Sequence, residues 1–217
     1  RGMFEFQDES SQLTAYACNP GKKDFVIDIC AGAGGKTLHL AALMQDTGTL
    51  VATDLYRDRL KNLKIRAARA GIKNLTLGTL SEVQQAFREK ADILLIDAPC
   101  SGSGVYGRHP DRKWKLDHNK LQYYLDTQRD ILHKNAGLVK PGGILIYATC
   151  SLIPDENEKQ IERFLSQHPE FEAMPVQEEL EKNKIIIPFN RNKTMLTVLP
   201  HYFQSDGFFI ARLKKNR

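Results

Sequence analysis

The chain has 217 residues, of which 41% are hydrophobic and 26% are charged, and these proportions are ordinary for a soluble globular protein. Its 31 lysines and arginines outnumber its 26 aspartates and glutamates, for a formal net charge of +5; this excess is compatible with a polyanionic partner but does not require one. No apolar run reaches the roughly 18 residues of a membrane span, and no signal-peptide pattern is visible.

The four cysteines are widely separated, at Cys18, Cys30, Cys100 and Cys150. They show no CxxC spacing, and no pair of histidines lies at metal-binding distance along the chain. The sequence therefore predicts neither a zinc site nor a disulfide framework. Cysteines of this kind are either buried or catalytic, and we expect no metal requirement and a cytoplasmic protein.

Strand-like and helix-like segments alternate in the first half of the chain. Asp8 or Ser10 can cap a first helix. The expected elements are a helix running to Cys18, a strand at 25–29, a helix at 38–44, a strand at 49–54, a basic helix at 58–70, a weaker strand at 75–77 and a helix at 83–89.

The second half continues the alternation. A buried-type strand at 93–97 precedes a glycine-punctuated, basic and aromatic stretch at 102–114. The expected elements after it are a helix at 121–136, a turn at 140–143, a strand at 143–148, a helix at 154–165 and a hairpin-like pair of strands at 194–199 and 207–213. Such alternation predicts an α/β fold, a three-layer sandwich whose mostly parallel sheet has an antiparallel edge. We expect one domain over 1–217, with 1–20 as a helical lead-in.

Reactive side chains follow the two central strands directly. Asp97-Ala98-Pro99-Cys100-Ser101-Gly102 closes one strand, and Thr149-Cys150-Ser151 closes the other. If these strands are neighbours in a parallel sheet, their carboxyl ends lie about 5 Å apart. Both thiols would then face the same crevice.

The glycine loop at 30–37 follows the first strand and opens a helix, so that its backbone N–H groups can approach a ligand. Asp54 lies about 20 residues further on, where such folds bind a nucleoside ribose. A P-loop would need a glycine at Cys30, and a dinucleotide site would need one at Thr37. An S-adenosylmethionine site needs only close backbone approach, and it fits best.

Several motifs together resemble the RsmB/Sun family of RNA cytosine-5 methyltransferases. They are Gln7-Asp8-Glu9-Ser10-Ser11-Gln12, Asp28-Ile29-Cys30-Ala31-Gly32-Ala33-Gly34-Gly35-Lys36-Thr37, Asp97-Ala98-Pro99-Cys100-Ser101-Gly102-Ser103-Gly104, Arg108-His109-Pro110-Asp111-Arg112-Lys113-Trp114, Ala148-Thr149-Cys150-Ser151, Pro154-Asp155-Glu156-Asn157-Glu158 and Asp206-Gly207-Phe208-Phe209. The blocks occur in family order over nearly the whole chain. Two departures are Gly32-Ala33, where the family has Ala-Pro, and Gly78-Thr79-Leu80, which lacks an acid expected on the adenine side.

The resemblance implies a Rossmann-like class I methyltransferase fold and S-adenosyl-L-methionine as cofactor. It assigns Cys150 as the nucleophile that adds to carbon 6 of cytosine and Cys100 as the group that aids release. Asp97 is expected to bond the cytosine edge around ring nitrogen 3, and also to contact the cofactor. The residues expected to bind the cofactor are Cys30, Ala31, Gly32, Ala33, Gly34, Gly35, Lys36, Asp54, Arg59 and Asp97.

The basic and aromatic stretch has two interpretations. Arg108, His109, Arg112, Lys113 and Trp114 could contact splayed RNA bases. Alternatively, Trp114 belongs to the core and the charges form a solvated face. The resemblance favours ribosomal RNA as substrate, then transfer RNA, with a monomeric chain preceded by an RNA-binding domain. A non-catalytic RNA-binding module of the same fold and a P-loop NTPase remain the alternatives.

Overall fold

The computed structural model describes residues 2–188, 192 and 194–217. Its α-helices are α1 (Glu9–Cys18), α2 (Gly35–Leu43), α3 (Arg57–Ala70), α4 (Leu80–Ala86), α5 (His118–Asn135), α6 (Glu158–Gln167), α7 (Val176–Lys182) and α8 (Pro200–Phe203). Its strands are β1 (Phe25–Ile29), β2 (Thr49–Thr53), β3 (Leu75–Leu77), β4 (Ala91–Asp97), β5 (Val139–Thr149), β6 (Phe171–Met174), β7 (Met195–Val198) and β8 (Phe208–Lys215). Short 3₁₀ helices are η1 (Ser103–Val105), η2 (Pro110–Lys115), η3 (Ala136–Leu138) and η4 (Pro154–Glu156).

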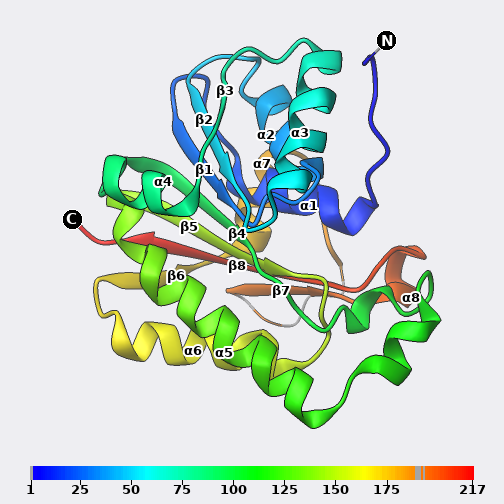
Figure 1. Ribbon diagram of the computed structural model, residues 1–217. Coiled ribbons are helices and arrows are strands. Elements are labelled where there is room, and N and C mark those ends of the chain that lie inside the picture. Colours follow the sequence, from blue (N-terminus) through cyan, green and yellow to red (C-terminus); the bar gives the residue numbers. More distant parts are fainter. Residues whose placement is uncertain (1, 189–191, 193) are drawn as a thin grey trace.

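The strands form one mixed sheet with the order β3-β2-β1-β4-β5-β8-β6, and β7 also pairs with β8 (Figure 1). Neighbours from β3 to β5 are parallel, whereas β8 runs antiparallel to β5. β6 and β7 pair with different halves of the outer edge of β8. The expected α/β class, parallel sheet and antiparallel pair are confirmed.

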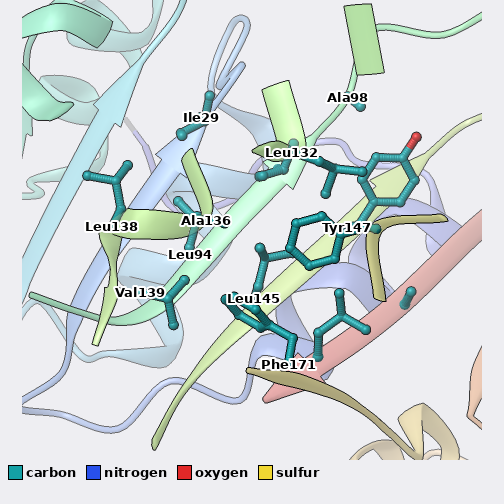
Figure 2. Packing of buried hydrophobic residues seen from close by; sticks show 14 of the residues in the cluster. Ile29, Leu94, Ala98, Leu132, Ala136, Leu138, Val139, Leu145, Tyr147 and Phe171 are labelled. Atoms are coloured by element: carbon teal, nitrogen blue, oxygen red, sulfur yellow. The ribbon is translucent and has the colours of Figure 1, made fainter. Parts of the chain in front are cut away.

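Helices cover both faces of the sheet, because side chains of each central strand alternate between two apolar cores. One face carries Leu94, Leu145 and Tyr147 and packs against α5 and α6 through residues such as Leu132 (Figure 2). The opposite face packs against α1, α2 and α7. Both faces of β4 are therefore buried, and its carboxyl end lies in the middle of the sheet, which suits a ligand site.

Several boundaries differ from the sequence prediction. α5 begins at His118 and not at 121, and the helix expected at 154–165 is divided into η4 (Pro154–Glu156) and α6 (Glu158–Gln167). The expected turn at 140–143 lies inside β5, where the register shifts against β4 and Gly142 has φ +79°. α4 begins at Leu80, earlier than expected, because Thr79 and Glu82 form a capping box at its start.

The sequence prediction also missed β6 and α7. β6 is only four residues long, and its register with β8 places it at the outer edge of the sheet. So short a strand carries too few residues for a period of two to stand out. The last strand, expected to belong to an edge hairpin, is instead paired on both sides.

Candidate active site

The two predicted cysteines lie side by side beyond the ends of β4 and β5. These strands are parallel neighbours, and Asp97 is in register with Ala148. A backbone hydrogen bond from Gly104 N to Cys150 O, 2.9 Å long, joins the two following loops. The Sγ atoms of Cys100 and Cys150 are 3.3 Å apart, within hydrogen-bond distance for sulfur. The prediction that the ends of these two strands bring both thiols together is confirmed.

The two thiols, either of which can donate in this contact, are shifted in acidity in opposite directions. The hydrogen bond from Cys100 lowers the pKa of Cys150, against the opposing effect of burial, and the cations of Lys36 and Arg112 lower it further. The same hydrogen bond, with burial, raises the pKa of Cys100 well above its usual range. Cys150 is therefore the thiolate side of the pair, and Cys100 is the thiol that donates to it.

Lys36 connects the glycine loop to this pair. Its Nζ lies 2.7 Å from Asp97 Oδ2 and 5.0 Å from the centre of the Phe208 ring, and its side chain is only 12% exposed. Burial is the largest single effect and would lower the pKa of Lys36, but the charge and hydrogen bond of Asp97, together with Cys150 and Asp28, outweigh it, and the pKa is raised. The lysine thus remains a cation beside Cys150, which the sequence prediction, treating it only as a cofactor contact, did not foresee.

The backbone of the glycine loop adopts a conformation that allows a ligand to approach it closely. Cys30, Gly32 and Gly34 all have positive φ. A Cβ at Gly34 would overlap the Leu63 side chain, whereas one at Gly35 would meet nothing within 4 Å. Gly34 is therefore required by packing, and Gly35 leaves its backbone free for a ligand.

Asp54 braces this loop. Its carboxylate accepts from Gly32 N at 2.9 Å and from Tyr56 N at 2.8 Å, and Arg59 Nη1 lies 4.0 Å away. Two of the roughly four lone-pair positions of a carboxylate remain for ribose hydroxyls. The expected ribose contact of Asp54 stays a prediction, and its bracing of the loop is an additional role.

A cavity of about 450 Å³ opens beside Asp54 at the carboxyl ends of β2 and β3. Its residues include Asp54, Leu55, Leu77, Gly78, Thr79 and Leu80. Leu55 is 86% exposed and offers an apolar wall. Thr79, which stands where the family has an acid, is engaged with Glu82 in the cap of α4.

Two observations fit this region to a nucleoside-bearing cofactor with a charged amino acid moiety. The backbone of Gly35 faces open space, and Asp54, which accepts from Gly32 N of the loop, also lines the cavity. In addition, Asp28 Oδ1 at the end of β1 is buried without a hydrogen-bond partner, whereas Oδ2 accepts from Thr37 Oγ1 at 2.6 Å. An unpaired buried carboxylate oxygen suits a cationic or N–H ligand group.

The replacement Asp28→Asn is expected to stabilise the protein at neutral pH. Burial raises the pKa of Asp28 to about 7, so the folded state holds a proton that the unfolded state releases near pH 4. Stability contributed by that proton is fully present below pH 4 and is lost as the pH rises to 7. The stability difference between variant and unmutated chain should grow by up to about 1.4 kcal/mol per pH unit in this window. Urea unfolding at pH 5, 6 and 7 measures it; a pH-independent difference would contradict the assignment.

The residues expected to contact RNA fall into three groups. The Arg108 guanidinium binds both carboxylate oxygens of Asp206, and this pair is partly buried. Arg112 lies beside Gly102, where a Cβ would overlap its guanidinium. His109, Lys113 and Trp114 are exposed; Trp114 is 83% exposed, with Lys113 Nζ 5.6 Å from its ring centre. The interpretation of Trp114 as a core residue is therefore wrong.

The P-loop interpretation is not supported by these contacts. Its lysine and threonine would face phosphate and metal, but Lys36 is paired with Asp97 and Thr37 with Asp28. Cys18 is buried in α1, as expected. In the part of the chain that the structure describes, no helix is long and apolar enough to cross a membrane.

Comparisons with known proteins agree with the residue-level interpretation. The family model described as 16S rRNA methyltransferase RsmB/F matches residues 15–214. Probable ribosomal RNA small subunit methyltransferase B proteins of Synechocystis sp. and Bacillus subtilis are each 38% identical over 99% of this chain and 48% of their own length. The chain thus spans about half the length of these relatives.

Solved structures support the same grouping. NSun6 from Pyrococcus horikoshii with SFG has a TM-score of 0.86 and 28% identity, covering 100% of this chain and 54% of that one. A methyltransferase homologue from the same organism has a TM-score of 0.82 and 28% identity, covering 99% and 68%. The resemblance to the RsmB/Sun motifs is confirmed, and the chain belongs to the RsmB/F family of 16S rRNA methyltransferases.

Proposed function

We propose that this chain catalyses methyl transfer from S-adenosylmethionine to carbon 5 of a cytosine in ribosomal RNA, with transfer RNA as the alternative substrate. The observation that carries the proposal is the pair of cysteines at the ends of β4 and β5, 3.3 Å apart, with Cys150 as the thiolate side. A methyltransferase acting on an oxygen or an exocyclic nitrogen has no need of two thiols at its centre.

S-adenosylmethionine is the methyl donor of this family, and NSun6 is a relative solved with SFG. In this chain, residues 30–36, Asp54 and Arg59 would hold it, with its adenosine portion toward the cavity lined by Leu55 and Gly78. When bound, it supplies an electrophilic methyl group for carbon 5.

Cys150 makes carbon 5 reactive. Its thiolate adds to carbon 6 of the cytosine, forming a carbon–sulfur bond and leaving carbon 5 electron-rich. After methylation, a base removes the carbon 5 proton, the ring double bond returns, and the carbon–sulfur bond breaks to release Cys150. Cys100, hydrogen-bonded to the leaving sulfur, aids this last step.

Asp97 and Lys36 would bind the base. The Asp97 carboxylate lies at the rim of the same site and is oriented by Lys36 at 2.7 Å. A hydrogen bond donated by Lys36 to ring nitrogen 3, while Asp97 accepts from the neighbouring amino group of the base, would favour addition at carbon 6, because the cation stabilises the negative charge that the ring gains.

The exposed surface of η2 would bind the RNA around the target base. His109, Lys113 and Trp114 lie there, and Arg112 faces the cysteines from the same element. The Arg108–Asp206 ion pair would fix the start of this stretch, since Asp206 also donates its backbone N–H to the Asp8 carboxylate.

The replacement Trp114→Ala is expected to weaken RNA binding by roughly tenfold, the loss of one base stack of 1–3 kcal/mol. The turnover rate at saturating RNA should be unchanged, because Trp114 touches neither thiol. Fluorescence anisotropy with a single-stranded RNA measures the affinity. Ile65→Ala is the matched control, an exposed apolar residue on α3. Equal losses of RNA affinity in both variants would show that η2 does not bind the RNA.

The proposal is tested by incubating the chain with tritiated S-adenosylmethionine and unmodified 16S rRNA or tRNA, followed by nucleoside analysis. Tritium in 5-methylcytidine from 16S rRNA is expected. Tritium only with tRNA would change the substrate. RNA binding without methyl transfer to either would favour the non-catalytic binding module.

A further inference from the structure

Glu156 is a fully buried carboxylate that lies between the two cysteine loops. Its Oε1 accepts from Ser101 N at 2.8 Å and from Gln128 Nε2 at 2.9 Å, and its Oε2 accepts from the hydroxyls of Ser101 and Ser151. Among the described residues, no lysine, arginine or histidine lies within ion-pair distance of it. Four uncharged donors therefore satisfy this carboxylate, and it has no cationic partner.

The donors are informative because of where they lie in the chain. Ser101 directly follows Cys100, and Ser151 directly follows Cys150. Gln128 of α5 also donates to Pro99 O at 3.0 Å, on the other side of Cys100. The Glu156 side chain thus binds the residue that follows each cysteine. These two residues, Ser101 and Ser151, are 50 positions apart in sequence.

Glu156 is itself fixed to the sheet. Its backbone carbonyl accepts from the buried Tyr147 hydroxyl at 2.7 Å, and Tyr147 is a fully buried residue of β5. The next residue, Asn157, accepts from Thr149 Oγ1 at 2.6 Å and donates to Ser151 O at 2.8 Å. The position of the carboxylate is therefore set by β5 and not by the flexible end of a surface helix.

We propose that Glu156 is a positioning residue that sets the separation of the Cys100 and Cys150 sulfurs by holding Ser101 and Ser151 at once. The inference rests on the proposed function, in which both thiols act on one base. Removing a buried acceptor with four donors would leave those donors unpaired. The two loops would then move apart, and the thiol–thiolate hydrogen bond would lengthen or break.

The negative charge of Glu156 also supports the hydrogen bond between the two thiols. It contributes to the raised pKa of Cys100, after the hydrogen bond to Cys150, burial and the charge of Cys150 itself. The groups that shift the pKa of Cys150 most are Cys100, burial, Asp97, Lys36 and Arg112. Glu156 thus favours the neutral thiol at Cys100, which is the state that can donate to Cys150.

The test measures the distance between the sulfurs without RNA or cofactor. Diamide oxidises two neighbouring thiols to a disulfide, with loss of two hydrogen atoms that reduce the reagent to a hydrazine. The rate of Cys100–Cys150 disulfide formation, followed by mass spectrometry of the linked peptides, reports how often the sulfurs meet. Circular dichroism shows which variants are folded.

Glu156→Ala is expected to slow this reaction by roughly tenfold or more, because a small displacement has large effects on an intramolecular reaction. Glu156→Gln should stay within about threefold of the unmutated chain, since its amide oxygen accepts as Oε1 does and the serine hydroxyls can turn to accept. Asp155→Asn is the matched control, because the side chain of the neighbouring Asp155 is 47% exposed and is paired with Lys159 at 2.9 Å. It should leave the rate unchanged.

Ser151→Ala covers the case in which Glu156→Ala does not fold, because it removes one oxygen and, of the contacts to Glu156, breaks only the one on the Cys150 side. The same oxygen also accepts from Ile153 N and contacts the Ser101 and Ser103 hydroxyls, and these bonds are lost as well. A severalfold slower reaction in a folded Ser151→Ala variant supports the proposal. An unchanged rate in folded Glu156→Ala, or in Ser151→Ala if the former is unfolded, overturns it.

Methyl transfer gives the second readout. Glu156→Ala should lower the turnover rate with the KM for RNA unchanged, and Glu156→Gln should restore most of it. A raised KM with normal turnover would contradict a role in positioning the thiols. If the unmutated chain transfers no methyl group, the proposed function fails, while the disulfide rates still decide the role of Glu156.

Discussion

Replacement of Cys150 by alanine is expected to abolish methyl transfer, with a fall in turnover of about 10⁴-fold or more, the scale seen when a covalent nucleophile is lost. The physical reason is that carbon 5 of cytosine is a poor nucleophile until sulfur adds to carbon 6. The Cys150 sulfur lies where β5 ends and has its pKa lowered by the Cys100 hydrogen bond, so it is the group prepared for that addition.

The matched control is Cys18→Ala. Cys18, the last residue of α1, is buried in the core, and burial raises its pKa, so it is an inert thiol. This variant should lose some stability and keep its turnover rate. Filter-bound tritium from S-adenosylmethionine measures both variants at equal folded concentration. If the turnover rate of Cys150→Ala is within tenfold of that of the unmutated chain, Cys150 is not the nucleophile.

Replacement of Lys36 by methionine is expected to lower turnover by about 10²-fold or more, the usual scale for losing one electrostatic contact at a reacting centre. Methionine keeps much of the length and the contact with Phe208, but it leaves Asp97 without its 2.7 Å partner. The cation beside Cys150 is lost in the same change.

The pH dependence of Cys150 alkylation separates this effect from damage to the cofactor site. The Lys36 cation lowers the pKa of Cys150, and the Asp97 charge raises it; Lys36→Met therefore moves the pKa upward. The alkylation rate by iodoacetamide, read on the Cys150 peptide, should reach half its maximum at a higher pH. Lys23→Met, an exposed lysine of the turn before β1, is the control. A midpoint equal to that of the control would show that Lys36 does not act on Cys150.

The mostly parallel sheet and the closeness of the two cysteines were predictable from sequence because each depends on a local pattern. The apolar runs before Asp97 and Cys150 mark buried strands, and parallel neighbours bring their carboxyl ends together. The glycine loop and Asp54 were predictable for the same reason, since their spacing along the chain is a consequence of the strand-loop-helix unit.

The polar network around the site was not predictable in this way. Glu156 has the sequence pattern of an acid in the first turn of a helix, but it is buried and bonded to Ser101, from a loop 55 positions away. Lys36 and Asp97 are likewise 61 positions apart. No periodicity identifies such pairs, because they depend on which loops the sheet brings together. The only signal was that Glu156 and Lys36 both lie within motifs that flank the predicted site.

The contacts of the basic and aromatic stretch at 102–114 were also not predictable from sequence. Its five candidate residues look alike in sequence, yet Arg108 is tied to Asp206 from the far end of the chain and Trp114 is exposed. Arg108 precedes η2, whereas Arg112, Lys113 and Trp114 lie within it, where the 3₁₀ geometry presents successive side chains in different directions.

The most direct test of the account is covalent trapping on RNA. Cys100→Ala and Cys150→Ala are each incubated with S-adenosylmethionine and substrate RNA, and the products are resolved on denaturing gels. Because Cys100 is proposed to aid release, Cys100→Ala should accumulate a protein–RNA band that peptide mass spectrometry locates at Cys150, and Cys150→Ala should give none. A band in Cys150→Ala, or a crosslink at any other residue, would contradict the proposed mechanism.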